Sequence, residues 1–250
     1  TPIKSSAASD VYKRQTLYDI ETQIPAFFHI TEASVHDSKV MNEIPYEPGS
    51  YYIFDRGYNN FKMLYKIHQI EAYFVVRAKK NLQYKSIKWK RRLPKNVFSD
   101  ASILLTGFYP KQYYPEPLRL VKYWDEEQER EFTFITNAMH ISALQVAELY
   151  KNRWQVELFF KWLKQHLKIK RFWGTTENAV RIQIYAAICT YCLVAIIQHD
   201  MQLDRSTYEV LQILSISLTD KTHLRDLFDK TKFQNDKERF GPNGPSLFNF

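Results

Sequence analysis

The sequence predicts an α/β protein in which strands and a helix near the start are followed by further strands and then by helices. The first observation is Tyr51–Phe54, a short apolar strand that ends at Asp55, with Gly57 close behind. The second is helical periodicity from Phe61 to Glu71 before another strand at Ala72–Ala78. This order is typical of an α/β unit, and it puts a carboxylate at the carboxyl end of a strand, where open sheets usually carry their sites.

Further strands are predicted on both sides of this unit. Upstream, Thr16–Tyr18 and Ala26–Thr31 are expected to be two strands joined by a turn across Asp19–Pro25. Downstream, three strands are expected, of which the last two form a hairpin around the acidic turn Asp125–Glu131: Ile103–Thr106, Leu118–Trp124 and Phe132–Thr136.

A single helix is predicted from Tyr150 to Lys168, with most of its circumference apolar. At ~100° per residue, its charged and phenolic side chains fall within roughly 60° to 80° of arc: Tyr150, Arg153, Glu157, Lys161, Lys164 and Lys168. Two interpretations are open. The stripe is either a solvated face with ion pairs from Glu157 to Lys161 and Lys164, or an active-site wall in which Glu157 ligates a cation and the cations hold phosphates.

Two more helices are expected after this one, at Asn178–His199 and Ser206–Leu218. The uncharged run from Ile182 up to Asp200 has a shorter apolar stretch than the ~20 residues that a membrane span needs, so we expect a buried core helix of a cytosolic protein and no membrane. Cys189 and Cys192 lie in this run without a second pair at ligand spacing, which favours buried structural thiols.

The composition favours a polyanionic partner. The chain has 250 residues, 45% of them hydrophobic and 16% aromatic, which is enough for a substantial core and excludes a disordered protein. The net charge of +8 and the pI near 9.2 suit nucleic acid, the commonest polyanion that proteins bind.

The densest positive charge lies between residues 79 and 95, interleaved with Tyr84 and Trp89 and without an acidic residue before Asp100. It comprises Lys79, Lys80, Lys85, Lys88, Lys90, Arg91, Arg92 and Lys95. A solvated loop is one interpretation. The other is a β-rich basic surface over residues 80–137 that contacts phosphates and stacks on bases, with binding that weakens steeply as salt rises.

Four residues at a specific spacing resemble the Tyr-Arg-Glu-Lys signature of DDE transposases of the insertion-sequence-four type: Tyr150, Arg153, Glu157 and Lys164. Asp55-Arg56-Gly57-Tyr58 resembles the second-aspartate motif of that family, and residues 174–180 resemble the segment after its glutamate helix. The resemblance runs from about Thr16 to Asp229.

The resemblance implies a ribonuclease-H-like catalytic core that is interrupted by a β-rich insertion. It implies that Asp55 and Glu157 are the second Asp and the Glu that, with a first Asp, bind two Mg²⁺ or Mn²⁺ ions, and that the enzyme cuts transposon ends and joins them to target DNA. The DNA-contacting residues would be Tyr150, Arg153, Lys161, Lys164 and Arg56 near the cut, with Lys88, Lys90, Arg91 and Arg92 in the insertion. Double-stranded DNA, a homodimer in the synaptic complex and a prokaryotic cytoplasmic location, associated with the nucleoid, are implied as well.

The expected division is a leader at 1–15, the core at 16–79 and 138–229, the insertion at 80–137 and a loose tail at 230–250. Ser5–Gln15 does not resemble the family and looks like a translated adapter scar. The strand that carries the first Asp is expected upstream of this chain, and Asp10, Asp19 and Asp37 do not replace it.

Three hypotheses follow: a truncated catalytic portion that by itself is inactive or impaired, a non-catalytic DNA-binding or inhibitory fragment, or an unrelated basic globular protein. Metal-dependent nicking separates the first from the second, and DNA binding separates both from the third.

Overall fold

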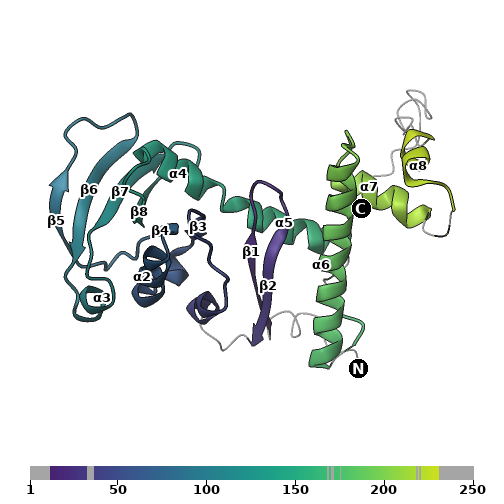
Figure 1. The fold of residues 1–250 in the computed structure, drawn as a ribbon, viewed down its shortest axis with the longest axis horizontal. Coiled ribbons are helices and arrows are strands. Elements are labelled where there is room, and N and C mark those ends of the chain that lie inside the picture. Colours follow the sequence, from purple (N-terminus) through teal and green to yellow (C-terminus); the bar gives the residue numbers. More distant parts are fainter. Residues whose placement is uncertain are drawn as a thin grey trace. The chain divides into compact units, whose positions relative to one another are not determined.

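The computed structural model describes residues 12–32, 37–167, 169, 172–174, 176–217, 219 and 221–230. These residues form two compact units, one that runs to Ile184 and one that begins at Tyr185. The first unit contains a mixed six-stranded sheet and the second is helical, so the predicted α/β class with C-terminal helices is confirmed (Figure 1).

The sheet has the order β3-β4-β8-β7-β6-β5, in which only β3 and β4 run parallel. Its strands are β3 (Tyr51–Phe54), β4 (Tyr73–Arg77), β5 (Tyr84–Trp89), β6 (Val97–Leu105), β7 (Leu118–Asp125) and β8 (Arg130–Thr136). Helix α2 (Phe61–Gln69) connects β3 to β4, as predicted, and the β7–β8 hairpin is confirmed. The strands of the basic segment therefore extend the same sheet from the far edge of β4.

Alternate side chains of β4 enter two cores, because successive residues of a strand point to opposite faces. Phe74 and Val76 pack with buried residues of α2, whereas Val75 packs against Val146 of α4 (Ala143–Lys151). Figure 1 shows α2 and α4 beside this sheet. The sheet is thus covered on both faces near the ends of β3 and β4.

A buried ion pair fastens the segment that leads into α4. Arg119 of β7 is 2% exposed and donates from Nε and Nη2 to the two oxygens of Asp100, at 2.7 and 2.8 Å. Its Nη1 donates to the carbonyl oxygens of Ala138 and Ile141. A buried guanidinium with these partners holds residues 138–141, and therefore the start of α4, against the sheet.

Strands β1 (Tyr12–Tyr18) and β2 (Pro25–Glu32) form a separate antiparallel pair around the predicted turn. The first strand begins at Tyr12 and not at Thr16. The Tyr18 ring lies 5.3 Å from that of Phe159 in α5 (Trp154–His166), and Figure 1 shows α5 beside this pair.

The prediction of one helix over 150–168 was wrong. Helix α4 ends at Lys151 and α5 begins at Trp154. Three i→i+3 hydrogen bonds span the junction: Arg153 N–H to Tyr150 O at 3.1 Å, Gln155 N–H to Asn152 O at 3.0 Å and Val156 N–H to Arg153 O at 3.3 Å. Asn152 and Arg153 keep helical dihedral angles, so the apolar periodicity continues through this tight turn and does not reveal it. Helix α5 buries Phe159 and Leu163, while Leu158 is exposed.

A short helix, α3 (Phe108–Tyr113), was not predicted; α6 (Glu177–Asp200), α7 (Thr207–Ile216) and α8 (Leu224–Lys230) form the C-terminal part. Ser206 and Glu209 cap α7 reciprocally. In the second unit, Val194 packs with Val210, Ile213 and Phe228. The loose tail predicted from 230 lies, but for Lys230, outside the described residues.

The prediction that α6 is a buried helix with buried thiols was wrong. Cys189 is exposed and Cys192 is half-buried. Only 33% of the most apolar 18-residue stretch of α6 is buried. By length and composition, α6 is the one helix among the described residues that could cross a membrane, and a single such helix is weak evidence. The apolar sequence did not reveal this exposure, because periodicity in a helix that is apolar all round does not say which side is covered.

Candidate active site

Asp55 lies exposed at the carboxyl end of β3, directly after the buried residue Phe54. Parallel pairing puts Phe54 opposite Val76, so Asp55 and Arg77 follow at the ends of neighbouring strands. The Asn59 side-chain amide donates to the carbonyl oxygens of Arg56 and Arg77, both at 2.8 Å. This amide fastens the turn after Asp55 to the end of β4.

Tyr150 in the last turn of α4 contacts Asp55. Its ring packs against those of Phe132 and Phe134 in β8, at centroid distances of 5.7 and 4.6 Å, and is 7% exposed. The Tyr150 hydroxyl donates to Asp55 Oδ1 at 3.1 Å. Two residues that are 95 positions apart in the sequence are therefore in direct contact.

Arg153 lies in the tight turn between α4 and α5 and joins the tyrosine to the glutamate. Its Nη2 donates to Glu157 Oε1 at 2.7 Å, and its guanidinium carbon lies 5.8 Å from the Tyr150 ring centroid. The Nε atom of Arg153 is buried without a hydrogen-bond partner. The ion pairs that one interpretation expected from Glu157 to Lys161 and Lys164 are replaced by this pair with Arg153.

The electrostatics of the site favour ionised Asp55. Partial burial raises the pKa of Asp55, but hydrogen bonds from the Arg56 backbone and Tyr150, with the charges of Arg153 and Arg77, outweigh it and the pKa is lowered. Burial and the nearby Asp55 charge raise the pKa of Tyr150 to about 12. At neutral pH the site therefore holds a carboxylate, a neutral phenol and two guanidinium groups.

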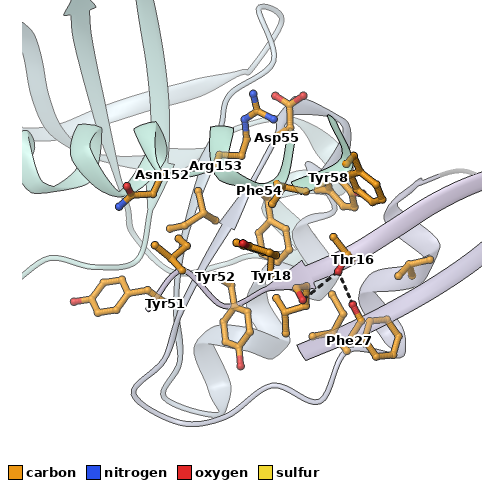
Figure 2. A pocket seen from close by; sticks show the side chains of 17 residues that line it. Thr16, Tyr18, Phe27, Tyr51, Tyr52, Phe54, Asp55, Tyr58, Asn152 and Arg153 are labelled. Carbon is orange, nitrogen blue, oxygen red and sulfur yellow. Dashed lines mark hydrogen bonds between the residues drawn. The ribbon is translucent and has the colours of Figure 1, made fainter. Parts of the chain in front are cut away.

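A pocket of about 270 Å³ opens beside these groups. Figure 2 shows the Asp55 carboxylate and the Arg153 guanidinium close together at one end of it, with the aromatic side chains of Tyr18, Tyr52 and Phe54 farther in. The pocket is bordered by residues 16–18 of β1, by residues 51–54 of β3 and by Val156 and Phe160 of α5. Its walls are thus mostly apolar, and one end is charged.

The remaining predicted contacts lie apart from this cluster. Lys161 and Lys164 are exposed on α5, and Arg56 is half-buried with its Nε atom enclosed and unpartnered. In the basic segment every residue of β5 is exposed, including Lys88 and Trp89, and Arg91 and Arg92 are exposed as well. Lys90 differs, because its Nζ pairs with Asp100 Oδ2 at 2.9 Å.

The model of the transposase DDE domain family matches residues 3–193, which is most of the chain and includes residues 3–15 of the segment that was expected to be a leader. The chain belongs to the DDE transposase family. The predicted resemblance to insertion-sequence transposases is confirmed.

Three relatives of this transposase domain extend the comparison. A putative transposase y4zB of Sinorhizobium fredii is 34% identical over 90% of this chain and 63% of its own length. A probable transposase for insertion sequence element IS5377 of Geobacillus stearothermophilus is 30% identical over 72% and 48%, and a putative transposase for insertion sequence element IS4SA of Synechocystis is 25% identical over 81% and 58%. The chain thus spans about half to two thirds of the length of these relatives.

The motif that follows the glutamate helix in the transposase domain has a steric reason. Gly174 lies against Ala179 of α6, and a Cβ atom built on Gly174 would collide with the Ala179 side chain. The glycine and the alanine therefore permit a close approach between the loop and the first turn of α6.

Transposases of this family generally depend on divalent metal ions, so the donors of the site decide whether such ions fit. Carboxylate oxygens suit Mg²⁺ and Mn²⁺. Asp55 carries them directly after β3, and Glu157 carries them in the first turn of α5. Over the part of the chain that the structure describes, no group of three or more His, Cys, Asp or Glu could hold a metal ion. The oxygen donors of these two side chains are of the kind that a divalent metal ion prefers.

Sequence analysis missed two residues of the site. Arg77 was not singled out, although its place at the end of the strand next to β3 was a signal that could have found it. Asn59 was missed because nothing in its local sequence indicates a hydrogen bond to Arg77, 18 residues away. The places of Arg77 and Asn59 in the site both depend on how β3 and β4 pair.

Proposed function

We propose that this chain is the catalytic part of a transposase that cuts transposon-end DNA and transfers its strands in cut-and-paste transposition, with Asp55 and Glu157 as metal ligands. The observation that carries the proposal is the contact of Tyr150 with Asp55 and of Arg153 with Glu157 in a chain of this family. These contacts, with the Arg153 guanidinium carbon 5.8 Å from the Tyr150 ring centroid, connect four of the predicted residues and support the proposal. On a merely solvated helix face, the Tyr150 hydroxyl would not donate a hydrogen bond to a carboxylate at the end of a strand.

The residues of the chain divide the work at the scissile phosphodiester. When bound, two Mg²⁺ or Mn²⁺ ions activate a water or 3′-hydroxyl and neutralise the leaving oxygen. Asp55 stays ionised because Tyr150 and Arg153 stabilise its charge, so it is ready to bind a cation. Arg153 can fork onto a phosphate oxygen, and Lys161 and Lys164 add exposed positive charge along α5.

We also propose that β1 to β4, α2, α4 and α5 form a ribonuclease-H-like core, with the basic segment at 80–137 as its insertion. In the described sheet, β3 pairs with β4 alone, and its other edge and β1 both border the pocket. A strand placed there would pair with β3 and end near Asp55. This is a suitable position for the strand that carries the first Asp of the family.

One observation favours a second function for this chain by itself, as a non-catalytic DNA-binding or inhibitory fragment. Among the described residues no group of three potential metal ligands is present, whereas the family uses three carboxylates. The exposed cations of the basic segment do not depend on the third carboxylate. Such a fragment would bind DNA and would not cut it.

The working complex is proposed to be a homodimer on double-stranded DNA in the prokaryotic cytoplasm, because two DNA ends must be joined together.

The exposed cations of the basic segment support DNA as the partner. Replacing Lys88, Arg91 and Arg92 by glutamine should flatten the salt dependence of DNA binding, by about 0.9 per lost phosphate contact in the log-log slope. An unchanged slope would assign these three cations to solvent.

The decisive test is metal-dependent cleavage of element-end DNA by the complete gene product. Asp55→Ala and Glu157→Ala should each abolish nicking in Mg²⁺ while DNA binding without metal persists, because each substitution removes a proposed metal ligand and leaves every cation of the chain in place. Lys111→Ala, an exposed change outside the site, is the control. A complete protein that binds DNA and cuts equally well without Glu157 would refute the assignment, and one that never cuts would favour the second function.

A further inference from the structure

A second pocket lies at the carboxyl end of β4 and includes Arg56, the residue that follows Asp55. It holds about 250 Å³ and is lined by five cations and one carboxylate: Arg56, Arg77, Lys79, Lys80, Lys122 and Glu131. The cations come from the turn after β3, from the end of β4 and from β7. This concentration of positive charge is therefore a product of the fold as well as of the local sequence.

The charge of this pocket is largely uncompensated. Its only ion pair among the described residues joins Lys122 Nζ to Glu131 Oε1, and the two atoms are 4.0 Å apart, which is long for an ion pair. Burial and the charge of the neighbouring Arg56 lower the pKa of Arg77. Arg56 Nε is buried without a hydrogen-bond partner. A bound anion would offset the repulsion between these cations and would accept a hydrogen bond from the unpaired Arg56 Nε donor.

Arg77 and Arg56 connect this pocket to the candidate active site. Arg56 directly follows Asp55, and the charge of Arg77 acts on both Asp55 and Tyr150. The Arg77 guanidinium lies 4.8 Å from the centroid of the Phe132 ring, against which Tyr150 also packs. A ligand that reaches both places should carry negative charge at two positions along its length.

We propose that this pocket binds a backbone phosphate of the DNA strand that is cut at Asp55, a phosphate neighbouring the scissile one. The inference rests on the proposed function, since it needs a strand at Asp55. Arg77 is the residue that spans the two positions, and Arg56 completes the pocket with its free Nε donor. The phosphate holds the strand in register with the carboxylates and leaves base sequence unread.

A continuous strand suits the pocket better than a free phosphate ion. Lys79 and Lys80 are exposed at its rim, and the exposed basic strand β5 follows closely along the chain. A strand that leaves the pocket over Lys79 and Lys80 meets more positive charge. A site for a small free anion would instead enclose its ligand on every side.

The test measures binding of a short fluorescent duplex by the full chain, without metal, over a range of salt concentrations. Arg77→Gln should weaken binding about tenfold, as expected for one lost charge-assisted hydrogen bond, and reduce the log-log salt slope by about 0.9. Lys79→Gln with Lys80→Gln is the second variant, because both side chains are exposed and their loss leaves the core intact. Lys62→Gln with Lys66→Gln removes the same charge from the exposed face of α2 and is the matched control.

The outcomes separate the pocket from the proposed function. Reduced slopes in both pocket variants and an unchanged slope in the control support the proposal, whereas equal slopes in all four proteins overturn it. Inorganic phosphate that binds the wild type and not Arg77→Gln, with DNA slopes unchanged, would overturn it in favour of a free-phosphate site. A wild type that binds no DNA would refute the proposed function itself.

Discussion

Tyr150→Phe isolates the contact between α4 and Asp55 at the end of β3. The ring keeps its packing against Phe132 and Phe134, and only the hydroxyl that donates to Asp55 at 3.1 Å is lost. Hydrogen bonds to charged groups contribute about 1.5–3 kcal/mol, and solvent screening of the exposed Asp55 reduces this to about 1 kcal/mol. We expect that decrease in the free energy of unfolding at pH 7, measured by urea denaturation.

The pH dependence tests the cause of this decrease. The pKa of Asp55 is lower in the folded protein than its ordinary value, so its stabilisation is present above the unfolded pKa of about 3.9 and is lost as pH falls through the folded pKa. The difference between wild type and Tyr150→Phe should thus be full above about pH 5 and shrink below about pH 4. Tyr73→Phe, the same atomic change on β4, is the control. A difference that does not vary with pH, or that Tyr73→Phe reproduces, refutes the reasoning.

Three further predictions concern other parts of the first unit. Arg119→Met should lower the free energy of unfolding by about 3 kcal/mol at pH 7, because it removes two buried hydrogen bonds to the Asp100 carboxylate and leaves the exposed Lys90 as its remaining charged partner; urea denaturation measures it, and a loss below about 1 kcal/mol would contradict it. Gly174→Ala should cost about 1–3 kcal/mol through the collision with Ala179, seen as a lower melting temperature, and an unchanged melting temperature would show that the loop moves freely. Glu157→Gln should change stability by less than about 1 kcal/mol, since its ion pair is exposed, yet abolish metal-dependent nicking by the complete protein; a large loss of stability would assign Glu157 a structural role.

The order of strands and helices around β3 was predictable, because it depends on the local pattern of apolar residues. The apolar run Tyr51–Phe54, the helix at Phe61 and the hairpin around Asp125–Glu131 all appear where the sequence indicated. The turn inside 150–168 was not predictable, because Asn152 and Arg153 keep helical dihedral angles and the junction differs from a continuous helix only in three i→i+3 hydrogen bonds. The exposure of Cys189 was missed for a related reason, since an apolar sequence does not state which of its faces finds a partner.

The sequence by itself determined which residue types the site contains, because the spacing of Tyr150, Arg153 and Glu157 and the aspartate after a strand are local features. Only the tertiary structure decided their partners. Tyr150 binds Asp55, and Arg77 lies beside it, because parallel pairing of β3 with β4 and packing of α4 on the sheet bring distant segments together. Contacts of this kind follow from which faces are buried against one another, and no stretch of sequence carries that information on its own.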